Sequence, residues 1–154
     1  MKIEESIKKV RNYPKEMEKI TFASLKKNET VIAKMNVQQM EIGKKPDGTW
    51  QDYYSPATQD WPGRVGDATG RIKLKDTGEF HESVLSKTKA WKGRRGRAVS
   101  SSRQRVVGIE FQGIDKYDLE SDYGPIFGLT EENLKKVTEI VASDLYKGEK
   151  QYWK

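Results

Sequence analysis

Apolar residues near the start of the chain recur at helical spacing. Ile3, Ile7 and Val10 fall on one face of a short helix over residues 2–12, which Pro14 is expected to interrupt or restart. A longer helix should follow and end at Gly43, because the positions of one stripe recur at steps of three and four residues: Met17, Ile20, Phe22, Leu25, Ile32, Met35, Gln39 and Ile42. Residues 1–43 are therefore predicted to be helical. The apolar stripe either covers a core alone or also contacts a neighbouring subunit.

The next segment, residues 44–73, carries turn signals and aromatic rings but no sustained period. Lys45-Pro46-Asp47-Gly48 predicts a turn. A stretch of this length without regular structure is unusual inside a compact domain and is typical of a binding or contact segment. We expect an ordered loop or arm whose candidate interface residues are its aromatic side chains, Trp50, Tyr53, Tyr54 and Trp61. Its glycines do not form a phosphate loop, because no Lys-Ser/Thr pair follows them.

Residues 74–113 are predicted to form an antiparallel meander. After a turn at Asp76-Thr77-Gly78, residues 84–91 alternate as a strand does, and residues 97–111 hold one long or two short further strands. The clearest alternation of core residues in that second stretch is made by Val107, Ile109 and Phe111.

A closing helix is predicted over residues 130–147, after a connection over residues 114–129. Thr130 is a suitable N-cap, and an apolar stripe follows it: Leu134, Val137, Ile140, Val141 and Leu145. Residues 148–154 are expected to be a charged tail, with Tyr152 and Trp153 as candidate interface residues. The predicted fold is a single α+β domain, with one or two N-terminal helices, an antiparallel sheet, a C-terminal helix packed on the sheet, and an extended arm and tail.

Composition limits the chemistry that the chain can perform. Of 154 residues, 34% are hydrophobic and 34% are charged, so we expect one modest core that is completed by assembly. The absence of cysteine excludes disulfides and thiolate sites, and a single histidine excludes a His-rich metal site. We expect no cofactor and no metal. No apolar run approaches the ~20 residues of a membrane span, and no leader pattern opens the sequence, so we expect a soluble, non-secreted protein.

Charge is distributed unevenly. Lys and Arg total 29 against 23 Asp and Glu, and one stretch holds eight basic residues and no acidic one: Lys87, Lys89, Lys92, Arg94, Arg95, Arg97, Arg103 and Arg105. This basic hairpin is a solvated face, a protein contact or part of a path for DNA. A groove for single-stranded nucleic acid would need several stacking rings, and only Trp91 lies among these cations.

The connection before the closing helix holds an acidic cluster, formed by Asp115, Asp118, Glu120 and Asp122. It lacks the central glycine and terminal glutamate of a calcium loop. We expect a solvated loop, or a patch that meets the basic hairpin of a neighbouring subunit through the candidate interface residues Asp118 and Asp122.

Catalysis is not indicated. His81 is the only imidazole, and its neighbours Glu82 and Ser83 point away from it on a helical turn or strand. We expect a solvated or interface histidine and no enzymatic activity.

Two longer motifs carry a resemblance. The first motif is Leu-Lys-Asp-Thr-Gly-Glu-Phe-His-Glu-Ser at residues 74–83, and the second is Tyr-Gly-Pro-Ile-Phe-Gly-Leu-Thr-Glu-Glu at residues 123–132. Both follow an Asp-Gly-Thr-Trp turn at residues 47–50. In order and spacing these motifs resemble the virion-morphogenesis or tail-completion proteins of tailed bacteriophages. The amino-acid sequences of these motifs are also similar to those of ring proteins from phages that infect Bacteroidetes, including crAss-like phages.

The resemblance implies a structural role without catalysis. Members of such families are small α+β subunits that assemble as sixfold or twelvefold rings at the head–tail junction, neck or upper tail. The implied partners are further copies of the chain, the portal, other neck or tail proteins and, without sequence specificity, packaged DNA. The implied location is the virion, after assembly in the host bacterial cytoplasm. The alternative, from the basic hairpin and an isoelectric point near 9.3, is a small basic nucleic-acid-binding protein.

Overall fold

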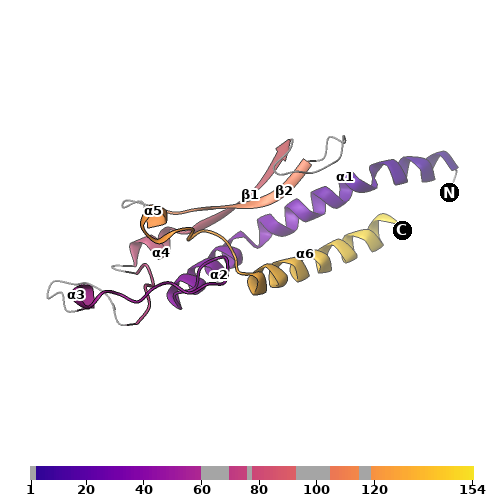
Figure 1. Cartoon of the computed structure of the whole chain (residues 1–154). Coiled ribbons are helices and arrows are strands. Elements are labelled where there is room, and N and C mark those ends of the chain that lie inside the picture. Colours follow the sequence, from indigo (N-terminus) through magenta and orange to yellow (C-terminus); the bar gives the residue numbers. More distant parts are fainter. Residues whose placement is uncertain (1–2, 60–69, 76–77, 93–104, 115–118) are drawn as a thin grey trace. The chain divides into compact units, whose positions relative to one another are not determined.

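A computed structural model describes residues 3–59, 70–75, 78–92, 105–114 and 119–154 of the chain (Figure 1). The predicted mixed α+β class is confirmed, and most of the described residues are helical. The elements along the chain are α1 (Ile3–Lys27), α2 (Glu29–Glu41), α3 (Pro56–Gln59), α4 (Glu79–Ser83), β1 (Leu85–Lys92), β2 (Arg105–Gln112), α5 (Leu119–Tyr123) and α6 (Glu131–Tyr152).

The chain divides into two compact units. The first comprises Met1–Asn28, Thr88–Glu110 and Thr138–Lys154, and the second comprises Glu29–Lys87 and Phe111–Val137. Each unit therefore combines segments that are far apart in the sequence.

The N-terminal helices divide at Asn28 and not at Pro14. α1 continues through Pro14, whose ring is exposed, so water can satisfy the carbonyl group that loses its helical hydrogen bond. At the end of α1, the Asn28 side chain donates to the Ser24 carbonyl at 2.8 Å, and its backbone N–H donates to the Leu25 carbonyl at 3.0 Å. These tighter bonds end the helix. The expected break at Pro14 and the expected unbroken helix to Gly43 are both wrong.

In the first unit, α1 and α6 run side by side in opposite directions (Figure 1). The buried hydroxyl of Ser24 donates to the Asp144 carboxylate at 2.7 Å. Nearer the start of α1, the Tyr13 hydroxyl donates to the Glu149 carboxylate at 2.8 Å. Gly148 lies against the side chain of Ile20, which leaves no room for a Cβ atom. Each contact joins residues that are far apart in the sequence, and together the contacts hold the two helices against each other at several points along their length.

The last residues belong to this helix pair. α6 continues past the predicted boundary at residue 147 and ends at Tyr152. The Tyr152 hydroxyl donates to the Lys9 carbonyl at 2.6 Å, and Trp153 stacks on the ring of Tyr13, with centroids 5.7 Å apart. The expected free tail is replaced by packing, because two aromatic rings bury apolar surface against α1.

Strands β1 and β2 pair as a two-stranded antiparallel sheet. Lys89 of β1 forms an ion pair with Glu110 of β2. Residues 97–111 were expected to hold one long or two short strands, and their described part, residues 105–111, belongs to one strand. Val107, Ile109 and Phe111 are half-buried, and so are Gly108 and Glu110 between them, so burial along β2 does not follow the predicted alternation.

The second unit holds a small hydrophobic core. Met40 of α2 packs with Val84 and Ile126, and partly buried side chains surround them: Val37, Leu74, Phe80, Leu119, Tyr123 and Phe127. The core thus joins α2 to α4, to the residue before β1, to α5 and to the segment between α5 and α6.

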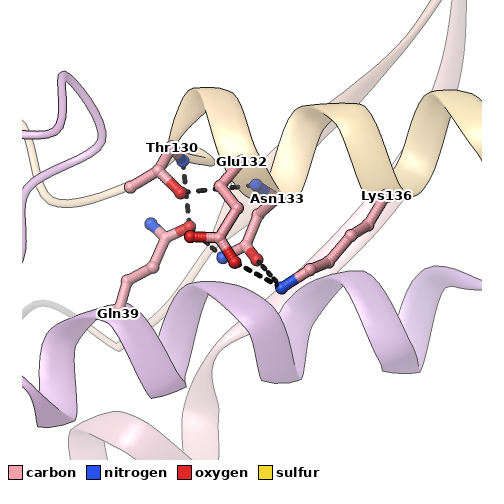
Figure 2. A network of polar contacts seen from close by, with 5 residues as sticks. All are labelled: Gln39, Thr130, Glu132, Asn133 and Lys136. Atoms are coloured by element: carbon pink, nitrogen blue, oxygen red, sulfur yellow. Dashed lines mark hydrogen bonds and ion pairs between the residues drawn. The ribbon is translucent and has the colours of Figure 1, made fainter.

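A buried polar network fixes the start of α6 on α2 (Figure 2). The side-chain oxygen of Gln39 accepts from the Thr130 backbone N–H at 2.9 Å and from the Asn133 amide at 2.6 Å. The Gln39 amide donates to the Gly128 carbonyl at 3.0 Å. The Asn133 N–H donates to the Thr130 hydroxyl at 3.4 Å, so the predicted N-cap is confirmed.

Candidate interaction surfaces

The turn of the arm, residues 43–51, is held by short-range hydrogen bonds. The Asp47 carboxylate accepts from the N–H and hydroxyl of Thr49 at 2.9 and 2.6 Å, and these two bonds lower the pKa of Asp47. The Gly48 N–H donates to the Lys45 carbonyl at 3.0 Å. The predicted turn is confirmed, and it leads into an antiparallel bridge between Lys44 and Trp50.

A second bridge brings residue 71 back to this turn. Tyr53 pairs with Arg71, and the Ile72 N–H donates to the Asp52 carbonyl at 2.8 Å. The Arg71 guanidinium donates to the Gln51 carbonyl at 2.7 Å. The arm therefore contains local pairing and the short helix α3, and its two ends meet in the second unit.

These pairings assemble an aromatic–cation cluster, defined as Lys44, Trp50, Tyr53 and Arg71. The Arg71 guanidinium carbon lies 5.2 Å from the Trp50 ring centroid and 4.6 Å from that of Tyr53. The Lys44 ammonium lies 5.4 Å from the Trp50 centroid. Each such contact contributes roughly 0.5–1 kcal/mol at an exposed site.

The rings of the cluster stay open to solvent. Trp50 is 50% exposed and Tyr53 is 63% exposed. Because Arg71 is bonded to the backbone and stacked on both rings, the side chains lose less conformational freedom when they bind a partner. Trp, Tyr and Arg are also the side chains enriched in the energetic centres of protein interfaces. The cluster is the best-formed candidate site among the described residues.

The other two aromatic residues predicted for the arm do not join the cluster. Tyr54 is half-buried, and its hydroxyl accepts from the Lys73 N–H at 3.2 Å. Trp61 lies outside the described residues.

The basic hairpin is described only in part. Lys87 is exposed, and Lys89 is paired with Glu110 across the sheet. The structure does not describe the side chains of Lys92 and Arg105. Four further residues lie wholly outside the described part: Arg94, Arg95, Arg97 and Arg103. Of the acidic candidates, Asp122 is exposed in α5, whereas Asp118 lies outside.

The C-terminal candidates, Tyr152 and Trp153, are engaged with α1 in their own chain. Trp153 still exposes 44% of its surface. In the structure, the Trp153 ring stacks on the ring of Tyr13 in the same chain.

His81 is buried, with 6% of its surface exposed, so the expected solvated histidine is wrong. Its Nε2 atom lies 2.9 Å from the Lys73 carbonyl; since a carbonyl only accepts, Nε2 carries the proton. Burial lowers the pKa of His81, and the bond to Lys73 opposes that effect only in part. Ser83 is occupied elsewhere, because its hydroxyl donates to the Phe80 carbonyl and accepts from the Ile114 N–H. His81 and Ser83 do not form a nucleophile–base pair.

Sequence reasoning missed the roles of three residues, although it placed one of them, Gln39, in the helical stripe. Asn36 and Gln39 are buried polar residues of α2 that bond the segment before α6. Arg71 links the two aromatic rings of the arm. The available signal was the occurrence of amides inside the apolar stripe of α2, which indicates polar partners within the core.

The described residues contain no group of three or more acidic or histidine side chains that could hold a metal ion. No described helix combines the length and apolar character of a membrane span. Comparisons of the chain with protein-family models, with curated proteins and with solved structures give no match.

Proposed function

We propose that this chain is a structural virion protein of a tailed phage. In this role it forms a homo-oligomeric ring at the head–tail junction, neck or upper tail, joins the portal to tail proteins and surrounds the DNA path. The role requires no catalytic step and no cofactor. It rests on the motif resemblance in residues 74–83 and 123–132.

The structural observation that carries the proposal is the aromatic–cation cluster. Trp50 and Tyr53 keep half or more of their surface exposed while Arg71 holds them in place. A passive adaptor needs surfaces of this type, because it acts only by binding its neighbours. Such a cluster can anchor on a portal or tail protein through ring burial and through carboxylates that meet Lys44 and Arg71.

The test is association of the purified protein with the portal complex, followed by light scattering at low and moderate salt. Trp50→Ala should weaken association by about tenfold or more, the loss expected for an interface anchor. Tyr146→Ala is the matched control, because Tyr146 is 59% exposed and carries Lys150 4.3 Å from its ring centroid. Failure of the wild-type protein to bind the portal, as a ring or otherwise, would contradict the proposal.

The second candidate function is binding of single-stranded nucleic acid. The same cluster favours it, because rings beside cations can stack bases and neutralise phosphates. The two functions differ in salt dependence: phosphate binding weakens steeply as ionic strength rises, whereas a contact dominated by apolar burial weakens less. Retention of single-stranded DNA by a protein that ignores the portal would favour this candidate.

A further inference from the structure

The first turns of α1 present an apolar stripe without a described partner. Ile3, Ile7 and Val10 are 79%, 49% and 61% exposed, and their spacing places them on one face of the helix. On one side the stripe is bordered by Tyr13, which contacts α6 through Glu149. On the other side, helical geometry places mainly basic residues, all of them exposed: Lys8, Arg11 and Lys15, with Glu4 as the one acidic neighbour. The stripe is thus a convex apolar ridge with a basic margin.

The second unit carries a groove of about 530 Å³ between α2, α4 and the start of β1. Sites that bury most of a bound group have volumes of about 300–1,000 Å³. Apolar side chains from both walls line the groove, namely Ala33, Val37, Val84 and Leu85. Leu85 is 54% exposed, so the groove already presents apolar surface to solvent.

The charged residues that line the groove are mostly acidic. Glu29, Glu41 and Glu82 contribute carboxylates, and Lys34 contributes the single cation of the lining. Glu41 also pairs with Lys75 at 3.2 Å, while Glu82 is exposed on α4. The groove is therefore a concave apolar surface with an acidic margin.

We infer that the α1 stripe of one copy docks in the α2–α4–β1 groove of the next copy. The two surfaces match in shape, since a helical ridge with apolar residues at i, i+4 and i+7 is the form that apolar grooves bind. They also match in charge, because Lys8, Arg11 and Lys15 would approach an acidic margin. This inference rests on the proposed ring and identifies the contact between its subunits.

In the ring, each copy docks its stripe in one neighbour and receives the stripe of the other neighbour in its own groove, so the contact is heterologous. Each copy therefore offers one stripe and one groove, and repetition of the contact closes a ring or extends a filament. A two-fold dimer would instead exchange stripe and groove reciprocally between two copies and stop at the dimer. Because the stripe and the groove are different surfaces, variants can damage them separately in a complementation test.

The test uses the full chain and measures native mass by sedimentation velocity over a wide range of concentration. Ile7→Glu damages the stripe and Leu85→Glu damages the groove; each variant alone should self-associate about tenfold or more weakly than wild type. An equimolar mixture of the two should form a heterodimer and stop there, because only one competent stripe and one competent groove remain. Val31→Glu is the control: Val31 is 45% exposed on α2 and lies outside the groove lining.

Circular dichroism and the portal-binding assay separate loss of folding, loss of this contact and failure of the proposed function. Circular dichroism must show that the variants fold; if Leu85→Glu does not, Glu82→Lys replaces it, since Glu82 is exposed. A wild-type assembly that Ile7→Glu and the folded groove variant leave unchanged overturns this contact but not the ring. A wild-type chain that stays monomeric at every concentration also overturns the contact, and the portal-binding assay then decides separately on the proposed function.

Discussion

Gly43 and Arg71 are in direct contact, although 27 positions separate them in the sequence. A Cβ atom at residue 43 would lie 2.8 Å from the Cβ of Arg71, closer than such atoms approach. Gly43 also has a φ of 72°, in the left-handed region. The absence of a side chain at the end of α2 thus permits the approach that places Arg71 against Trp50 and Tyr53.

Gly43→Ala should lower the free energy of unfolding by about 2–4 kcal/mol, from the left-handed backbone and the clash with Arg71 together. Gly48→Ala is the matched control: its φ is 85°, but no described atom lies within 4 Å of the added Cβ. It should lose only the backbone contribution, about 1–2 kcal/mol. Urea denaturation measures both values. Equal losses would show that the contact with Arg71 is not a constraint.

Gln39→Leu should destabilise the second unit by about 2–4 kcal/mol. The change leaves the Thr130 N–H and the Asn133 amide without their partner (Figure 2). The Gly128 carbonyl also loses the bond from Gln39. Gln38→Leu is the control, because Gln38 precedes it in α2 and is exposed. The comparison is again by urea denaturation, and a similar stability for the two variants would mean that water replaces the network.

His81 should make the protein less stable in weak acid. Burial holds the pKa of His81 below its ordinary value of 6.5. Below that pH the unfolded chain therefore binds a proton that the native chain does not, and the free energy of unfolding falls as the pH falls. Well above pH 6.5 both states are neutral at this residue, and its contribution is constant.

The measurement is the change in unfolding free energy between about pH 7.5 and pH 5.5, in wild type and in His81→Gln. Gln retains a donor for the Lys73 carbonyl, and the carboxylates contribute equally to both proteins. A smaller acid loss in His81→Gln is expected. An identical loss would show that His81 is not responsible.

Tyr152 should contribute to the stability of the α1–α6 pair. Tyr152→Phe removes the bond to the Lys9 carbonyl and should cost about 1 kcal/mol. Tyr152→Ala also removes the ring that lies 5.9 Å from the ring of Tyr13 and should cost about 2–3 kcal/mol. Tyr146→Ala, on an exposed position of α6, should change the melting temperature little. If all three variants melt like wild type, the end of α6 is not held by α1.

Features that depend on neighbours in the sequence were predictable. The Lys45–Gly48 turn and the Thr130 cap both follow from hydrogen bonds between residues a few positions apart. The strand period placed Val107, Ile109 and Phe111 in a strand, but their burial equals that of Gly108 and Glu110 between them. The break between α1 and α2 is an exception: it was misplaced at Pro14, although the bonds of Asn28 that end α1 also join residues within a single turn.

The sequence by itself determined the α+β class, the helical N-terminal region, the cap of α6 and the absence of thiol chemistry. Only the tertiary structure decided that His81 is buried, that Gln39 bonds the start of α6, that Tyr152 belongs to a helix and that Arg71 lies between Trp50 and Tyr53. The physical reason is that burial and side-chain partners depend on residues far away in the chain. Periodicity and turn chemistry report only on residues within a few positions of one another.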